Sequence, residues 1–292
     1  MSSTKPTDGA KPALKILMLH GYTQSGPMFR SKTRALEKNL AKAFPNHALT
    51  LSYPTAPIQL FKSDIPQWDD PNGTSSFENS DPGGEEAPDA WGWWRRKGDK
   101  EPYSYEGMEI GFARLAEVLR SEGPFDGVIG FSQGGALAGL LASALETGRR
   151  EAFEAAQREG GMRFPESLEE DTGFVTDVVH PPFKFAVSYS GFGAGDNMLY
   201  RAFYEPKIST PMLHYIGSAD TVVEEKRSLR LVEACVDGAK EGRVVYHPGG
   251  HFLPSSQKQV VAPLIAFIKE VIEGAEEKKK EEENVEDMDV PF

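Results

Sequence analysis

The hydrophobic residues of this chain fall into short blocks that follow one of two patterns. Continuous apolar runs, typical of buried strands, occupy residues 15–19, 48–52, 125–129, 183–190, 212–216 and 244–247. Apolar residues at helical spacing predict helices at 34–44, 108–119, 223–236 and 258–272. Strands that alternate with helices predict an α/β fold, in which helices cover both faces of a mostly parallel central sheet.

Two polar stretches rich in proline, glycine or charged residues, at about 61–103 and 148–182, interrupt this alternation. We interpret them as insertions in one domain that covers residues 14–273. Residues 1–13 are predicted to be disordered. Residues 274–292 begin with a run of Lys and Glu and end in acidic residues, so we expect a solvated, disordered tail.

The composition narrows the choice of partners. A formal net charge of −12 argues against nucleic acid and anionic membrane surfaces. No apolar stretch approaches the roughly 20 residues that span a bilayer, and the first residues lack the apolar run of a secretory signal. The single cysteine, Cys235, excludes an internal disulfide and suits a reducing compartment. We therefore expect a soluble cytoplasmic protein, with the nucleus as an alternative location.

Residues 130–134 read Gly-Phe-Ser-Gln-Gly and lie between a predicted strand and a predicted helix. The sequence G-x-S-x-G in this context is typical of a nucleophile elbow, which presents a serine hydroxyl at the start of a helix. Ser132 is therefore the candidate nucleophile. The motif alone is weak evidence, and a plain strand–helix turn is the alternative.

A catalytic serine needs a base, and the base needs an orienting carboxylate. Asp220 follows the strand at 212–216, and His251 follows the strand at 244–247, in the order Ser, Asp, His that α/β-hydrolases use. Asp220 could instead be a turn or capping residue. His247 competes as the base, but we expect it to face the core. A metal pair of His247 and His251 lacks a third ligand, so neither a metal nor a cofactor is predicted.

An oxyanion hole requires two backbone N–H groups. We predict that they belong to Gln133, which follows the nucleophile, and to Tyr22, in the loop after the first strand. Ser25, Trp93 and Trp94 are candidates for substrate contact. For Ser25, the alternatives are a place at the entrance of the active site and a cap on the next helix. For Trp93 and Trp94, the alternatives are the floor of an acyl pocket and an anchor of the first insertion to the core. His20 is expected to pack beneath the loop.

Several segments together resemble the FSH family of serine hydrolases, which is related to the human ovarian-cancer-associated esterase-like protein. They are KILMLHGYTQS (15–25), residues 53–54, the Trp-rich segment WGWW (91–94), 103–107, FDGVIGFSQGG (125–135), 186–192, 211–220 and HPGGHFLP (247–254). The resemblance implies an α/β-hydrolase fold and hydrolysis of carboxylic esters or thioesters. It places Ser132, Asp220 and His251 at the positions of that family's catalytic triad.

The prediction for function is a carboxylesterase that cleaves hydrophobic acyl esters through an acyl-enzyme, with a small-molecule ester or thioester as the substrate. One alternative is a thioesterase that releases acyl or polyketide chains from an acyl-carrier protein, an activity that the resemblance implies for some fungal members of the family. Another is a non-catalytic binding module on a hydrolase scaffold. The complete set of serine, aspartate and histidine counts against the last.

Overall fold

The computed structural model of the chain describes residues 11–64, 88–171 and 176–288, with the stretch 275–288 as backbone alone. Its centre is a six-stranded sheet in the order β12-β11-β10-β7-β1-β2, and every neighbouring pair is parallel. The strands are β1 (Ala13–Leu19), β2 (Ala48–Ser52), β7 (Gly127–Phe131), β10 (Phe185–Tyr189), β11 (Met212–Gly217) and β12 (Val244–His247). The predicted parallel α/β sheet is confirmed.

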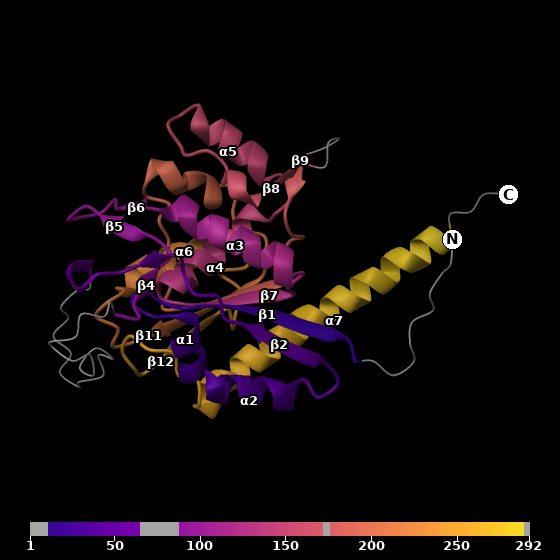
Figure 1. Ribbon diagram of the computed structural model, residues 1–292. Helices are drawn as coiled ribbons and strands as arrows, with labels where there is room; N and C mark the ends of the chain where they lie inside the picture. Colours follow the sequence, from indigo (N-terminus) through magenta and orange to yellow (C-terminus); the bar gives the residue numbers. More distant parts are fainter. Residues whose placement is uncertain (1–10, 65–87, 172–175, 289–292) are drawn as a thin grey trace.

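Helices cover both faces of the sheet (Figure 1). One face carries α3 (Met108–Glu122), α4 (Gln133–Ala144) and α6 (Glu225–Glu233), and the other carries α1 (Gly26–Lys32), α2 (Arg34–Ala43) and α7 (Lys258–Met288). Side chains alternate between the two layers along each strand. Leu17 and Leu19 therefore pack in the α3–α4 layer, whereas Ile16 and Met18 pack in the α2–α7 layer.

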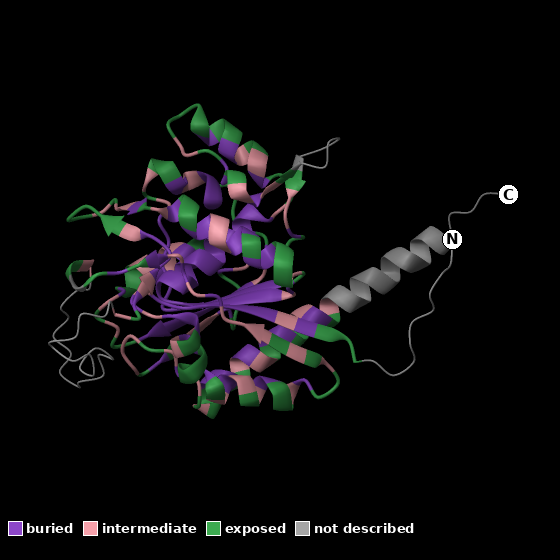
Figure 2. Cartoon of the chain, in the orientation of Figure 1, coloured by how far each residue is buried: buried purple, intermediate pink, exposed green. Residues whose placement is uncertain are grey.

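The central strands are buried on both sides, because helices exclude water from each face (Figure 2). Every residue of β7, β10 and β11 is buried, which explains why these strands are continuous apolar runs in the sequence. The edge strand β2 contains only exposed and half-buried residues. None of the helices in the described part of the chain has the length and apolar content that a membrane span requires.

The C-terminal helix differs from the prediction. We expected a disordered tail from residue 274, but α7 continues without a break to Met288. The reason is local: residues 275–288 contain no glycine or proline and are mostly Ala, Glu and Lys, which have high helix propensity. A helix already started by the packed residues before 274 extends through such a segment without a new nucleation step. At the other end, disorder was predicted for residues 1–13, but Ala13 is the first residue of β1; residues 1–10 lie outside the described residues.

The two insertions add short elements beside the central sheet. The first contains η1 (Lys62–Asp64), β4 (Trp91–Gly92) and β5 (Arg95–Lys97). Strand β4 pairs antiparallel with β3 (Ile58–Gln59), and β5 pairs antiparallel with β6 (Ser104–Glu106). Its residues 65–87 lie outside the described part. The second contains α5 (Arg149–Gln157), η2 (Glu166–Leu168) and the pair β8 (Glu169–Asp171) and β9 (Thr176–Val178). A further 3-10 helix, η3 (Met198–Phe203), follows β10.

Candidate active site

Ser132 lies on the turn between β7 and α4, with φ 54° and ψ −115°. A positive φ is strained for a residue with a side chain. The turn is tight enough to exclude side chains at its flanks: a Cβ on Gly130 would lie 1.9 Å from the carbonyl oxygen of Gly134, and one on Gly134 would lie 2.1 Å from that of Leu19. The Ser132 amide donates a 2.8 Å hydrogen bond to the Tyr189 carbonyl. This is the geometry of a nucleophile elbow.

The structure brings the three predicted polar side chains together. His251 Nε2 lies 2.9 Å from Ser132 Oγ, and His251 Nδ1 lies 2.7 Å from Asp220 Oδ2. An ionised carboxylate only accepts hydrogen bonds, so Nδ1 carries the proton and Nε2 is left to accept the serine proton. The imidazole is 14% exposed and the carboxylate 3% exposed. The imidazole is therefore partly accessible to solvent while the carboxylate is shielded.

Asp220 also organises the turn that holds it. Its Oδ1 accepts 2.9 Å hydrogen bonds from the amides of Val222 and Val223, while Oδ2 binds His251. Burial alone would raise the pKa of this carboxyl, but the hydrogen bond and charge of His251 and the Val223 amide outweigh it, so the pKa lies below its usual value. The turn role and the proposed catalytic role of Asp220 thus use different oxygens of one carboxylate.

The loop after β12 carries His251 across the end of the sheet. A Cβ on Gly217 would lie 2.6 Å from the Gly250 carbonyl oxygen, so this loop rests directly on the end of β11. The Ala219 amide donates to the Gly249 carbonyl at 3.1 Å. His247 is 1% exposed and its Nδ1 accepts from the Gly249 amide at 3.2 Å. It faces the core, as expected.

The two predicted oxyanion donors lie beside the nucleophile. Gln133 is the first residue of α4, so its N–H has no acceptor within the helix. On the other side, a Cβ on Gly21 would lie 3.3 Å from Ser132 Cβ, which places the loop of Tyr22 against the serine. Among backbone groups of the described residues, the Tyr22 amide has no acceptor. Neither N–H therefore has a backbone acceptor among the described residues, which is consistent with the predicted role.

His20 supports this loop from below. It is completely buried; its Nδ1 donates to the Gly21 carbonyl at 2.7 Å, and its Nε2 accepts from the Ala56 amide at 3.0 Å. Burial lowers its pKa to about 4, so the ring is neutral at pH 7. Both ring nitrogens are occupied, in agreement with the packing role predicted for it.

Comparison with known proteins identifies the family. The family model described as "Serine hydrolase (FSH1)" matches residues 10–262 of the chain. The chain belongs to this serine hydrolase family. The resemblance found in the sequence is thereby confirmed.

Relatives of this family member come from several organisms. Family of serine hydrolases 3 from Saccharomyces cerevisiae is 32% identical over 273 residues, which cover 92% of this chain and 87% of the relative. Esterase OVCA2 from Danio rerio is 34% identical over 254 residues, 83% of this chain and 91% of the relative. A Schizosaccharomyces pombe protein named dihydrofolate reductase is 34% identical over 248 residues. The match covers 84% of this chain but only 44% of that protein.

Solved structures confirm the predicted α/β-hydrolase fold. Acyl-protein thioesterase 2 from Zea mays aligns with a TM-score of 0.52 over 90% of this chain and 96% of its own, at 19% identity. Esterase PE8 aligns with a TM-score of 0.50 over 90% and 94%, at 18% identity. At these identities the likeness concerns the fold alone.

Three residues predicted to contact substrate occupy other positions in this serine hydrolase. Ser25 is 1% exposed and caps α1: its Oγ accepts from the Met28 amide and donates to Asp89 Oδ2 at 2.7 Å. Trp93 and Trp94 are 0% and 1% exposed and belong to the core beneath α3 and α4. Of the two readings left open for each residue, the Ser25 hydrogen bonds correspond to the helix cap, and the burial of both tryptophan rings favours the anchor.

Sequence reasoning missed the side chain of Gln133, which is 5% exposed. Its Oε1 accepts from the Trp93 amide and its Nε2 donates to the Trp94 carbonyl, both at 2.8 Å. The available signal was a polar residue at the start of an otherwise apolar helix, since a buried amide must find partners.

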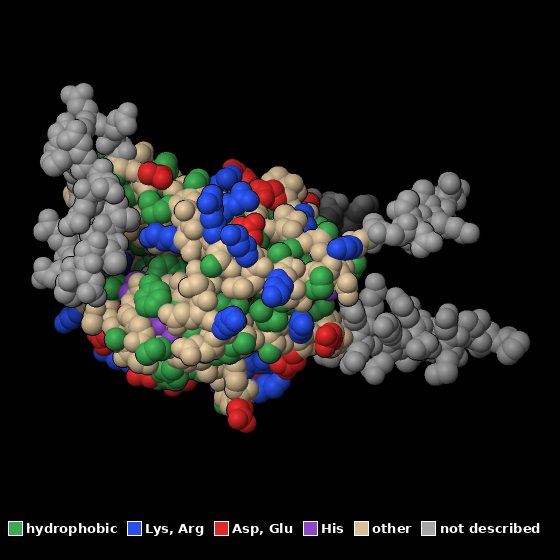
Figure 3. Space-filling view, turned by 90° about the horizontal axis from the view of Figure 1, so that it is seen from below, with side chains coloured by type: hydrophobic (Ala, Val, Ile, Leu, Met, Phe, Trp, Pro, Cys, Tyr) green, Lys and Arg blue, Asp and Glu red, His purple; other side chains and the backbone are tan. Residues whose placement is uncertain are grey.

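The surface of the molecule carries two further features near α1 and α2. Figure 3 shows a hollow on this side, around which hydrophobic side chains gather and in which histidine is visible. Phe252, which follows His251, is 42% exposed, and Phe61 is 60% exposed. Lys and Arg side chains also gather on the face that Figure 3 shows. The exposed ones on or next to α1 and α2 are Arg30, Lys32, Arg34, Lys38 and Lys42.

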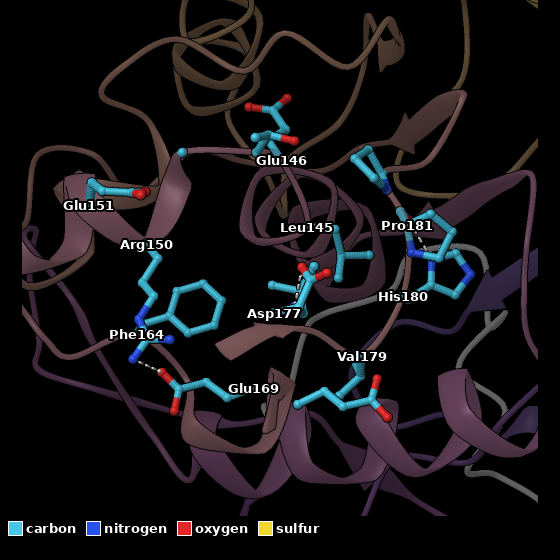
Figure 4. A pocket seen from close by; sticks show the side chains of 15 residues that line it. Leu145, Glu146, Arg150, Glu151, Phe164, Glu169, Asp177, Val179, His180 and Pro181 are labelled. Carbon is cyan, nitrogen blue, oxygen red and sulfur yellow. Dashed lines mark hydrogen bonds and ion pairs between the residues drawn. The ribbon is translucent and has the colours of Figure 1, made fainter. Parts of the chain in front are cut away.

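A separate cavity of about 590 Å³ lies in the second insertion (Figure 4). Leu145, which follows the last residue of α4, lines it, so it lies at the opposite end of that helix from Ser132. Its lining is acidic, but Arg150 forms a 3.1 Å ion pair with Glu169, and Glu146 accepts hydrogen bonds from the Thr210 amide and hydroxyl. The described residues contain no cluster of His, Cys, Asp and Glu that could hold a metal.

Proposed function

We propose that this chain is a carboxylesterase that cleaves hydrophobic acyl esters through a covalent intermediate on Ser132. The observation that carries the proposal is the continuous hydrogen-bonded series from Asp220 through His251 to Ser132, with distances of 2.7 and 2.9 Å. Family membership supports the same chemistry. The exposed aromatic ring of Phe252, beside His251 in the chain, supports a hydrophobic acyl group.

The first half of the reaction forms the acyl-enzyme. His251 Nε2 accepts the hydroxyl proton as Ser132 Oγ attacks the ester carbonyl carbon. Asp220 holds the ring in the required tautomer and stabilises the imidazolium. The backbone amides of Tyr22 and Gln133 donate hydrogen bonds to the oxyanion of the tetrahedral intermediate. The intermediate collapses as His251 returns the proton to the departing alcohol.

The second half consumes water. His251 accepts a proton from a water molecule that attacks the acyl carbonyl, and the same two amides hold the second oxyanion. Collapse releases the carboxylic acid, and His251 returns the proton to Ser132 Oγ. The dipole of α4 adds to the stabilisation, because Ser132 lies at its N-terminus.

The test is covalent labelling with a fluorophosphonate probe, together with rates on a series of esters that differ in acyl length. We expect labelling and hydrolysis in the wild type and the loss of both in Ser132→Ala. Ser143→Ala is the control, because Ser143 is a buried serine near the other end of the same helix. Undiminished labelling of Ser132→Ala would assign another nucleophile. A wild type that no serine-directed probe labels would favour a binding module without catalysis.

A second candidate, a thioesterase that unloads an acyl-carrier protein, is favoured by one observation. The exposed Lys and Arg residues of the α1–α2 face form a basic surface on a chain of net charge −12. α1 begins at Gly26, shortly after Tyr22, so this surface adjoins the proposed oxyanion loop. An acidic carrier would be attracted to it. We expect Lys38→Glu to slow hydrolysis of a carrier-bound thioester but not of the matched free thioester. A variant that hydrolyses the carrier-bound thioester at the wild-type rate would exclude this candidate.

A further inference from the structure

We propose that the side chain of Gln133 is a positioning residue that keeps the two oxyanion donors in register. Its own backbone supplies one donor, and its side chain fixes the peptide segment that holds the other. The inference rests on the serine hydrolase mechanism proposed above, and concerns a group that this mechanism does not use: the Gln133 carboxamide.

The carboxamide binds the backbone of residues 93 and 94, which form the bend between β4 and β5. Its Oε1 accepts from the Trp93 amide and its Nε2 donates to the Trp94 carbonyl, both at 2.8 Å. The side chain is 5% exposed, and the two tryptophans are 0% and 1% exposed. Water therefore cannot replace either bond, and a change that removes one leaves a buried polar group without a partner.

The Trp-rich segment in turn holds the loop of Tyr22 on both sides. Before Tyr22, Trp93 Nε1 donates to the His20 carbonyl at 3.0 Å. After it, the Thr23 amide donates to the Trp91 carbonyl at 2.9 Å. A Cβ on Gly92 would also lie 2.7 Å from the Tyr22 ring, so the segment and the ring are in direct contact.

These contacts connect the two donors by a short path. From the Gln133 side chain it runs through Trp93 to His20, two residues before Tyr22, and every link is a hydrogen bond inside the core. A rigid path matters here because an oxyanion donor must lie about 2.7–3.1 Å from the charged oxygen. A displacement of about 1 Å near a reacting centre can cost about 10²-fold in rate.

The alternative is that Gln133 only stabilises the core. The two roles differ in what they change. A purely structural bond affects the unfolding temperature, whereas a positioning bond also affects the binding of a tetrahedral oxyanion at unchanged binding of the ground-state ester. Inhibition by a trifluoromethyl ketone reports the binding of the tetrahedral oxyanion, since the adduct of the ketone with serine carries an oxyanion.

The test uses Gln133→Met, which keeps the length of the side chain and removes both hydrogen bonds, and the backbone N–H of residue 133 remains. Ser143→Ala is the matched control: it lies in the same helix, is completely buried, and its Oγ donates to the Phe203 carbonyl at 2.6 Å. For each variant we would measure kcat and KM on a short-chain ester, the inhibition constant of the ketone, and Tm.

We expect Gln133→Met to lower kcat about 10²-fold and to weaken ketone binding in proportion, with KM within about twofold. Ser143→Ala should lower Tm without changing kcat or ketone binding. Unchanged kcat and ketone binding in folded Gln133→Met would overturn the inference, and so would equal losses in the control. Labelling of wild-type Ser132 by a fluorophosphonate separates these results from a failure of the proposed function.

Trp93→Phe keeps the inference testable if Gln133→Met does not fold. The change retains a smaller buried aromatic ring and removes the Nε1–H bond to the His20 carbonyl, which is the next link of the same path. We expect kcat to fall about tenfold and ketone binding to weaken in parallel. A folded Trp93→Phe variant with wild-type values of both would overturn the proposal.

Discussion

Replacement of Gly134 by alanine tests whether the elbow depends on close approach of backbones. Gly134 is a residue of α4 without positive φ, so alanine is allowed by its backbone conformation and would gain up to about 1 kcal/mol in helix propensity. Its new Cβ would lie 2.1 Å from the Leu19 carbonyl oxygen and 2.6 Å from that of His20. Ordinary contacts begin at 3.4 Å, so α4 and the end of β1 must separate by more than 1 Å.

The cost of this separation follows from what surrounds it. Leu19 is 0% exposed in a strand paired on both sides, so the clash cannot be relieved by a side-chain rotation. Overpacking of a core typically costs about 1–3 kcal/mol, and here the obstacle is backbone. We expect Gly134→Ala to lose about 2–4 kcal/mol of unfolding free energy. Because the displaced carbonyls lead directly into Tyr22, we also expect kcat/KM to fall at least about 10²-fold.

Gly139→Ala is the matched control within the same helix. Its Cβ would approach the Leu231 Cδ1 to 3.0 Å, a methyl group at the end of a side chain that can move by a few tenths of an ångström. The gain in helix propensity then offsets the contact, and stability and activity should stay close to wild type. Urea unfolding followed by tryptophan fluorescence and ester hydrolysis would measure both variants. Gly134→Ala as stable and active as Gly139→Ala would refute the reasoning.

Three further predictions concern single side chains. Asp220→Asn should lower kcat/KM on esters about 10⁴-fold, because the amide no longer fixes the Nδ1–H tautomer of His251; a loss below tenfold would contradict the assignment. Ser25→Ala should cost about 1 kcal/mol of unfolding free energy through the lost cap and leave ester kinetics unchanged, whereas a raised KM would return Ser25 to the substrate entrance. Burial lowers the pKa of His214 from 6.5 to about 4, so the unfolded state binds its proton first as the pH falls between these values, and stability decreases. His214→Phe should remove about 3 kcal/mol of that decrease, measured as urea unfolding from pH 7 to pH 4; parallel curves for variant and wild type would contradict it.

The sequence predicted well wherever one interaction decides the structure. Strands buried on both faces admit only apolar residues, so β7, β10 and β11 appear as uninterrupted runs. The elbow is equally recognisable, because a Cβ at Gly130 or Gly134 would overlap backbone, which leaves glycine as the residue that fits. Chain order then located Asp220 and His251, since each follows a predicted strand.

The sequence left a choice open where two physical readings of one residue type compete. Serine before a helix is a cap or a surface hydroxyl, and the choice for Ser25 depends on Asp89, which is 64 residues away. Paired tryptophans are core or pocket, and local sequence does not contain what covers Trp93 and Trp94. The charged end of α7 was interpreted from its low apolar content, but helix propensity of Ala, Glu and Lys extends a helix that packing has begun.

Strand order explains why β11 ends in a glycine beneath the loop that carries His251. Ser132 follows β7 and His251 follows β12, and two strands, β11 and β10, lie between them. At about 4.8 Å per strand, the three intervals amount to about 14 Å across the sheet. The loop must cross the end of β11, where Gly217 faces the carbonyl oxygens of Gly249 and Gly250 at distances that no Cβ could occupy. The absence of a side chain at Gly217 therefore lets the loop lie low enough on the sheet for His251 to bridge carboxylate and hydroxyl.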